Sequence, residues 1–257
     1  MTPLRICVAG ATGWTGSAVA EAVLAAEDLE LASAVSRSAA GTDIGGAPVF
    51  AAVADALDAV DVMIDYTSHD AVKGNVITAI EHGVHVVVGS SGLTAGDYEE
   101  IDAAARSRGV GVVAAGNFSV TAAMLQAGAL LAARHVERWE VIDYASAGKV
   151  DAPSGTAREL AERLGGVRRP ELDVPATQPA RGEEVAGTQV HSLRLPSFTV
   201  STEVVFAAPD ERLSIRHDAG SSAAPYVAGT LLAARAAPGR LGLTRGLDTL
   251  LLDQRST

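Results

Sequence analysis

The stretch that decides the fold is Leu4–Gly16, LRICVAGATGWTG, in which an apolar run leads into three glycines. The run LRICVA has the length and composition of a buried β-strand. The segment after the glycines, Ser17–Ala26, is rich in Ala and Val and predicts a helix. A strand, a tight glycine turn and a helix in this order are typical of the first unit of a dinucleotide-binding domain.

The glycines of this turn have the spacing GxxGxxG. Because glycine has no Cβ, the backbone can turn sharply and a pyrophosphate can approach it closely. The helix N-terminus that follows offers free N–H groups and a partial positive charge to phosphates. A glycine-rich loop without a ligand is the alternative. We expect a cofactor pyrophosphate to bind here, with contacts from Gly10, Thr12, Gly13, Trp14, Thr15 and Gly16.

Further apolar runs alternate with segments that predict helices. Strands are expected at 29–36, 60–67, 84–90 and 110–115, and helices at 71–82 and 95–108. Strands that alternate with helices of this length form βαβ units around a parallel sheet. The first part of the chain is therefore predicted to be an α/β, Rossmann-like dinucleotide-binding domain.

The pattern changes in the second half of the chain. A long helix is expected at 120–135, a strand at 137–145, a helix at 153–164, a long loop at 165–187, three antiparallel strands at 190–195, 199–207 and 212–218, and a last helix at 224–236. This predicts a smaller α+β domain with an open mixed or antiparallel sheet. We expect residues 1–120 plus about 223–257 to form the dinucleotide-binding domain, and 121–222 to form a substrate-binding and oligomerisation domain.

Composition limits the function classes. The 257 residues carry 20 basic and 31 acidic side chains, a formal net charge of −11. Such a chain is a poor partner for nucleic acid or for anionic membranes. The single cysteine, Cys7, cannot form an intrachain disulfide, and the histidines lack metal-ligand spacing, so no metal site is expected. No apolar run has membrane-helix length and no signal-peptide layout is visible, so we expect a cytoplasmic protein.

The end of the second predicted strand indicates which cofactor is used. It reads Ser36-Arg37-Ser38, at the offset from the glycine turn where a carboxylate would bind the ribose of NAD. No acid is present, and two hydroxyls with a guanidinium suit a 2′-phosphate. We predict NADPH, with NADH as a weaker cofactor. A solvated surface charge is the alternative for Arg37.

The most specific stretch is 149–157, KVDAPSGTA. Asp151 can cap a helix and Pro153 can begin one. Ser154-Gly155-Thr156 would then present N–H groups and hydroxyls at a positive helix end, which is a site for a small anionic group. Lys149 could supply a charge or a proton. An ordinary capped helix with a solvated lysine is the alternative from the residues alone.

This run resembles the dihydrodipicolinate reductase family, which reduces 4-hydroxy-tetrahydrodipicolinate in lysine and diaminopimelate biosynthesis. The resemblance extends in order over the whole chain, through the segments 64–67 (IDYT), 89–93 (GSSGL), 116–119 (GNFS), 191–196 (HSLRLP) and 215–218 (IRHD).

The resemblance implies roles for individual residues. In addition to Ser36 and Arg37, it implies further cofactor contacts at the ends of the predicted strands. These are Tyr66, Thr67, Gly89, Ser90, Ser91, Gly116, Asn117 and Phe118. It implies that a substrate carboxylate is held by Ser154, Gly155 and Thr156, with Arg194 nearby and Lys149 beside the reacting ring. It also implies a homotetramer assembled through the sheets of the second domains.

The chain departs from the family at its centre. Ala145 and Ser146 stand where the family has a His pair, and neither can be a cationic acid. Reduction of a C=N bond needs a hydride and a proton, and a positioned acid typically contributes ~10²–10⁴-fold. Lys149 is therefore the candidate acid, with Ser146 the other candidate catalytic residue. Three hypotheses follow: the family reaction, a related imine or enamine reductase with another substrate, and an NADPH-binding protein without turnover.

Overall fold

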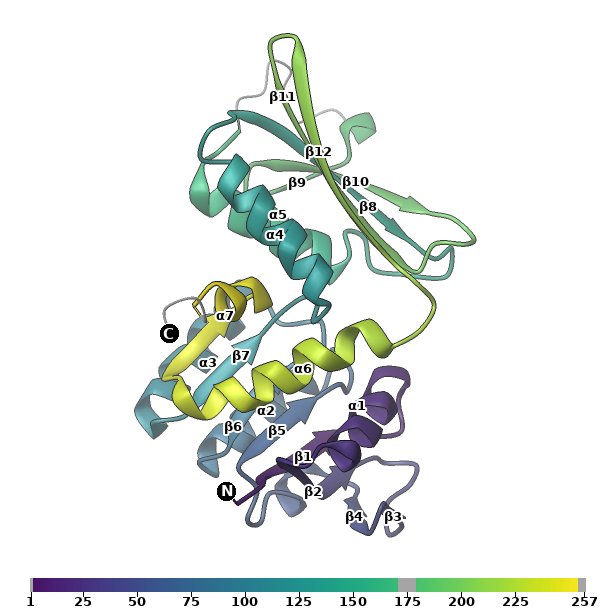
Figure 1. The fold of residues 1–257 in the computed structure, drawn as a ribbon, viewed down its shortest axis with the longest axis vertical. Coiled ribbons are helices and arrows are strands. Elements are labelled where there is room, and N and C mark those ends of the chain that lie inside the picture. Colours follow the sequence, from purple (N-terminus) through teal and green to yellow (C-terminus); the bar gives the residue numbers. More distant parts are fainter. Residues whose placement is uncertain (1, 171–178, 254–257) are drawn as a thin grey trace. The chain divides into compact units, whose positions relative to one another are not determined.

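The computed structural model describes residues 2–170 and 179–253, which form two compact units (Figure 1). Unit 1 takes its residues from Met1–Ser119 and Ala223–Thr257, and unit 2 from Val120–Ser222. The chain therefore begins in unit 1, folds unit 2 as one insertion, and returns to complete unit 1.

Unit 1 is built on an eight-stranded sheet with the order β13-β7-β6-β5-β1-β2-β4-β3. Every pair of neighbours is parallel except β3 and β4. The predicted Rossmann-like α/β class is confirmed. The strands are β1 (Leu4–Ala9), β2 (Leu29–Val35), β3 (Asp43–Ile44), β4 (Ala47–Phe50), β5 (Val62–Asp65), β6 (His85–Val88), β7 (Gly111–Ala114) and β13 (Gly242–Arg245).

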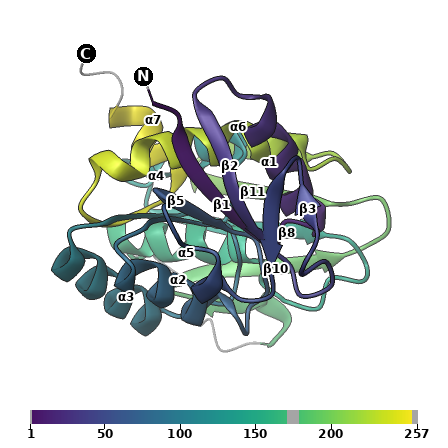
Figure 2. The same ribbon diagram turned by 90° about the horizontal axis from the view of Figure 1, so that it is seen from below.

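Helices cover both faces of this sheet (Figure 2). One layer contains α1 and α6 in mutual contact, and the other contains α2 and α3. Strands that are apolar on both sides, such as Val86–Val88, suit this sandwich because both of their faces are buried. The helices are α1 (Trp14–Ala25), α2 (Val72–Glu81), α3 (Ala95–Arg108), α6 (Ala224–Ala236) and α7 (Leu247–Asp253), with short 3₁₀ turns η1 (Val53–Asp55) and η3 (Ala237–Gly239).

The order of the strands reverses beside β1. From β1 the chain continues to β2 on one side, whereas β5 pairs with β1 on the other side. In open α/β sheets, ligands bind at such a reversal of strand order, outside the carboxyl ends of the strands. The turns that follow β1, β2, β5 and β6 are therefore where a cofactor site is expected.

Unit 2 has a five-stranded sheet with the order β12-β11-β8-β10-β9, and α4 and α5 pack on one face of it. The core between sheet and helices includes Trp139, Val141 and Phe206 from the strands and Leu160 and Leu164 from α5. The elements are α4 (Val120–Ala132), β8 (Arg138–Ala145), α5 (Gly155–Val167), η2 (Pro179–Arg181), β9 (Glu183–Val185), β10 (Thr188–Arg194), β11 (Val200–Ala208) and β12 (Glu211–Ala219).

The expectation of three consecutive antiparallel strands is wrong in one respect. β11 and β12 form an antiparallel pair, but β10 lies parallel to β8 and has no pairing with β11. β8 stands between them and pairs with both. The turn signal after Arg194 marks a passage across the end of β8, where the Leu195 amide donates to the Ala145 carbonyl at 3.1 Å, and not a hairpin.

Several predicted boundaries also differ. The helix expected from Ser17 begins at Trp14, and the helix expected from Pro153 begins at Gly155 and extends to Val167. The loop expected at 165–187 contains strand β9, while its residues 171–178 lie outside the described residues. The short strands β3, β4 and β13 and helix α7 were not expected, because segments this brief carry little periodicity.

Candidate functional site

The glycine turn between β1 and α1 requires glycine at two positions. Gly10 has φ +83°, and a Cβ there would lie 2.3 Å from the Tyr66 carbonyl oxygen. A Cβ on Gly16 would lie 2.1 Å from the Gly10 carbonyl oxygen. This close packing lets α1 begin three residues earlier than the sequence predicted. Trp14, Thr15 and Gly16 therefore form its first turn.

The N-terminus of α1 fits a phosphate. Gly13 is the N-cap, no side chain accepts a hydrogen bond from the helix end, and no acidic residue lies in the first turn. The first amide groups of a helix have no intrahelical partner, so they are donors that an anion can use. Trp14 is 55% exposed at this end and contacts Tyr226 edge to face.

A cluster of hydroxyls lies at the ends of β1 and β2. The Thr12 and Ser36 hydroxyl oxygens are 2.7 Å apart, and those of Ser36 and Ser38 are 3.2 Å apart. Arg37 is exposed beside them and makes no hydrogen bond or ion pair with any described residue. Hydroxyls and an uncommitted guanidinium can all bind phosphate oxygens.

The turns after β5 and β6 are joined by a buried carboxylate that the sequence reading had not assigned to the site. Asp65 is fully buried and accepts hydrogen bonds from Thr67 and Ser90, two of the predicted cofactor residues. Gly89 lies against the Tyr66 ring, where a Cβ would approach within 2.2 Å of the ring. The two turns are thus held as one surface, which also carries the exposed Ser91.

Tyr66 and Phe118 pack against each other. Phe118 is 2% exposed and its ring contacts Tyr66 edge to face at 6.4 Å between centroids. The Tyr66 hydroxyl lies 2.7 Å from the Thr230 hydroxyl, and burial raises the pKa of Tyr66 well above its usual value. Before Phe118, Gly116 is exposed and the Asn117 side chain accepts from the Ser119 amide at 2.8 Å.

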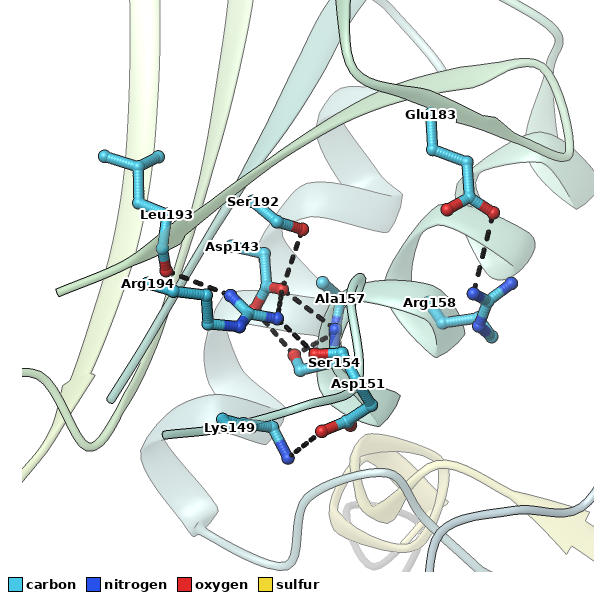
Figure 3. Close-up of polar contacts among 10 residues, drawn as sticks. All are labelled: Asp143, Lys149, Asp151, Ser154, Ala157, Arg158, Glu183, Ser192, Leu193 and Arg194. Carbon is cyan, nitrogen blue, oxygen red and sulfur yellow. Dashed lines mark hydrogen bonds and ion pairs between the residues drawn. The ribbon is translucent and has the colours of Figure 1, made fainter. Parts of the chain in front are cut away.

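In unit 2 a second buried carboxylate organises the predicted anion site (Figure 3). Asp143 on β8 accepts from the Ser154 amide at 2.8 Å and from the Ser154 hydroxyl at 2.6 Å. Ser192 and Arg194 on β10 donate to the same carboxylate at 3.2 and 2.9 Å. Asp143 thereby ties the N-terminus of α5 to two neighbouring strands.

Ser154, and not Asp151, caps α5. The Ser154 hydroxyl accepts from the Ala157 amide at 3.3 Å, so Gly155 and Thr156 form the first turn of the helix. Asp151 instead pairs with Lys149, whose Nζ lies 2.8 Å from the Asp151 carboxylate. The predicted roles of Asp151 and Pro153 at the helix start are therefore wrong, because the Ser154 hydroxyl already occupies the cap position.

The structure shows the surroundings of Arg194 and of Ala145 and Ser146, the two residues at which the chain departs from the family pattern. Arg194 is directed at Asp143 and at the Asp151 carbonyl oxygen, so it braces the loop that carries Lys149 (Figure 3). Ala145 is fully buried at the end of β8. Ser146 is exposed, and its carbonyl accepts from the Lys149 amide at 3.0 Å.

Asp65 and Asp143 are the residues that sequence reasoning missed. Each lies on a strand among apolar neighbours, where a charged side chain is costly unless it is hydrogen-bonded. An aspartate within an apolar strand was therefore the sequence signal that could have identified both residues. Among the described residues no group of three or more His, Cys, Asp or Glu side chains could hold a metal ion, and none of the described helices is long and apolar enough to cross a membrane.

Comparison with known proteins identifies the family. The model described as "Dihydrodipicolinate reductase, N-terminus" matches residues 4–118, and the model described as "Dihydrodipicolinate reductase, C-terminus" matches residues 116–251. Proteins named 4-hydroxy-tetrahydrodipicolinate reductase from Nocardia farcinica and Cutibacterium acnes are 38% and 36% identical to this chain. Each alignment covers 96% of this chain and 98% of the relative.

Solved structures share the fold. A dipicolinate-bound dihydrodipicolinate reductase from Paenisporosarcina sp. TG-14 matches with a TM-score of 0.76 at 24% identity, over 96% of this chain and 99% of the other. GenD2 from gentamicin A biosynthesis, solved in complex with NAD, matches with a TM-score of 0.67 at 17% identity, over 98% and 91% of the two chains.

Proposed function

Because the chain belongs to the dihydrodipicolinate reductase family, we propose that it uses NADPH to reduce 4-hydroxy-tetrahydrodipicolinate or a closely similar cyclic imine dicarboxylate. The family makes it an NAD(P)H-dependent oxidoreductase. The observation that carries the choice of substrate is the loop of unit 2. Asp143 binds the N-terminus of α5 directly, and Arg194 links Asp143 to Asp151, the partner of Lys149.

The residues of unit 1 fit the cofactor. The N-terminus of α1 provides amide donors for the pyrophosphate, and Thr67 and Ser90 provide hydroxyls at the ends of β5 and β6. The choice of NADPH over NADH rests on Ser36 and Arg37, which offer a hydroxyl and a free guanidinium where an NAD enzyme would place an acid. When bound, the cofactor supplies the hydride.

The residues of unit 2 supply the anion site and the proton. Gly155 and Thr156 begin α5, so their amides can hold a substrate carboxylate at the positive helix end. Lys149 is 30% exposed and its ammonium is directed by Asp151. We assign Lys149 as the acid that protonates the reduced substrate. At the two positions where the family has histidines, Ala145 and the exposed Ser146 offer no ionisable group.

A second candidate is a related reductase acting on another imine or enamine. The buried Ala145 and the exposed Ser146 favour it, since loss of an imidazole pair changes both the charge and the shape that a substrate meets. The anion site would still select a carboxylate. Both candidates use the same cofactor and the same lysine, so they differ in the substrate alone.

We also propose that the protein assembles as a homotetramer through the unit 2 sheets. The helices α4 and α5 cover one face of this sheet. On the opposite face lie Ile142, Tyr144 and Val205, which are only partly buried in the single chain. This face also carries charged side chains, among them Glu203 and Arg216. Partly exposed apolar side chains within a polar surface are features that a second copy can bury.

The test is NADPH consumption with 4-hydroxy-tetrahydrodipicolinate generated in the cuvette by its synthase, followed by a panel of imine carboxylates. Turnover of the first substrate supports the family reaction. Turnover of a panel member alone supports the second candidate. Tight NADPH binding without turnover of any compound would overturn both and leave a binding protein.

A further inference from the structure

The Asp65 carboxylate accepts four hydrogen bonds. Its Oδ1 accepts from the Thr67 amide at 3.0 Å, the Thr67 hydroxyl at 2.8 Å and the Ser90 hydroxyl at 2.6 Å. Its Oδ2 accepts from the Asn75 side-chain amide at 2.9 Å. These donors come from the turn after β5, the turn after β6 and helix α2, so the carboxylate holds three elements of unit 1 together.

The carboxylate is charged and lacks a positive partner. The backbone amide of Thr67 and the amide group of Asn75 can only donate, so they face unprotonated oxygens. No Lys, Arg or His among the described residues forms an ion pair with Asp65. The four hydrogen bonds stabilise this carboxylate, but none of their donors carries a formal positive charge.

Asp65 is the last residue of β5, beside the reversal of strand order where a dinucleotide would lie. The Tyr66 amide, next in sequence, donates to the Ala9 carbonyl at 2.9 Å, immediately before the glycine turn. In a sheet of this order a dinucleotide crosses the reversal point from one mononucleotide half to the other. With the hydroxyl cluster of Ser36 on the β2 side, the nicotinamide half belongs on the β5 and β6 side.

We propose, resting on the NADPH-dependent reduction above, that Asp65 is a positioning residue that holds Thr67 and Ser90 for the nicotinamide half and whose uncompensated charge favours oxidised over reduced cofactor. The oxidised ring is a cation, whereas the reduced ring is neutral. A fixed negative charge therefore lowers the free energy of the state in which the hydride has left, and it needs no reorganisation to do so.

The experiment compares the dissociation constants of NADP⁺ and NADPH for the full-length wild-type protein and for Asp65→Asn. Calorimetry with either dinucleotide needs no substrate and no turnover. We expect Asp65→Asn to weaken NADP⁺ binding more than NADPH binding. The dissociation constant of NADP⁺ divided by that of NADPH should rise about fivefold to twentyfold, the size expected of one partly screened charge. An equal change in both constants would overturn the proposal.

Ser90→Ala is the matched control, because it removes one donor and keeps the carboxylate. It should weaken both dinucleotides by a similar factor and leave the ratio unchanged. If Asp65→Asn does not fold, the double variant Asp65→Asn with Asn75→Asp restores a hydrogen-bonded pair and keeps one negative charge in the same cluster. Its ratio of dissociation constants should stay close to that of the wild type, and a rise of about twentyfold or more would contradict the proposal.

The outcomes separate this inference from the proposed function. A wild-type protein that binds both dinucleotides without reducing any imine would overturn the reductase proposal, and the ratio would still decide the role of Asp65. A wild-type protein that binds neither dinucleotide would overturn both.

Discussion

At the scale of single residues, Arg37 is the side chain that should separate the two cofactors. It is exposed and uncommitted beside the Ser36 hydroxyl. A hydrogen bond to a charged group is worth about 1.5–3 kcal/mol, or roughly tenfold or more in affinity. Arg37→Ala should therefore raise the KM for NADPH about tenfold and leave the KM for NADH nearly unchanged.

The measurement is steady-state kinetics with both cofactors, and Arg134→Ala is the control, since Arg134 is an exposed arginine of unit 2. Equal effects of Arg37→Ala on the two cofactors would contradict the assignment of a 2′-phosphate site.

Also at this scale, the sequence offered candidate reactive residues but not the buried carboxylates that hold them. Ser154 and Arg194 were expected to contact the substrate, a role that stays a prediction, and the structure turns both toward Asp143. A motif names residue types at a spacing. It does not show that their buried partner lies on a strand, 11 residues from Ser154 and 51 from Arg194 in sequence.

At the scale of elements, the β1–α1 turn is sterically restricted. A Cβ at Gly16 would lie 2.1 Å from the Gly10 carbonyl oxygen, whereas one at Gly74 in α2 would meet nothing within 4 Å. Gly16→Ala should lower the free energy of unfolding by about 1–3 kcal/mol, as overpacking does, and weaken NADPH binding.

Gly74→Ala is the matched control and should raise that free energy by up to ~1 kcal/mol, because alanine is the better helix former. Chemical denaturation of the two variants gives the comparison. A Gly16→Ala protein as stable as the wild type would show that the helix and the turn can separate.

His85 at the start of strand β6 should make the free energy of unfolding depend on pH. Burial lowers the pKa of His85 below its usual 6.5, and its Nδ1 accepts from the Gly111 amide at 2.9 Å, so the folded ring is neutral. The unfolded chain binds the proton more readily. The contribution of His85 is therefore present above about pH 6.5 and is lost as the pH falls from there through the folded-state pKa.

His85→Asn keeps an acceptor for that amide and removes the titrating group. The loss of unfolding free energy between pH 7 and pH 5 should be smaller in this variant than in the wild type. Denaturant titrations at both pH values provide the measurement, and parallel pH profiles would contradict a neutral His85.

The long elements of the fold could be predicted because their patterns are long. The expected bounds of α3 and α6 agree with the structure at both ends, since the apolar pattern and the flanking residues coincide there. The neighbours of β10 could not be predicted. The order of strands in a sheet is fixed by packing between distant segments, and a hairpin-like turn signal is also compatible with a passage across β8.

At the scale of the whole molecule, the chain divides the proposed reaction between two units. Unit 1 carries the phosphate-binding turn and the hydroxyl clusters, and unit 2 carries the anion site and Lys149. Unit 2 is a single insertion in the chain of unit 1. The change from alternating strands and helices to consecutive strands made this organisation predictable from the sequence.

Assembly is the second property at this scale. Ile142 lies on the sheet face opposite α4 and α5, opposite Glu203 of β11. Ile142→Glu would place another carboxylate beside Glu203 and should shift the protein from tetramer to smaller species in light scattering after gel filtration. Leu241→Glu, at a 58% exposed position of unit 1, should leave the mass unchanged. A tetrameric Ile142→Glu protein would place the interface elsewhere.

The most direct test of the central claim is the kcat of the wild type and of Lys149→Ala for 4-hydroxy-tetrahydrodipicolinate with saturating NADPH. We predict a wild-type rate within about tenfold of ~10 s⁻¹, a typical enzyme rate, and a loss of ~10²–10⁴-fold in the variant, as expected when a positioned acid is removed. NADPH binding should be unchanged. Equal rates in the two proteins, or no consumption of NADPH by the wild type, would contradict the assignment of Lys149 as the acid of this reaction.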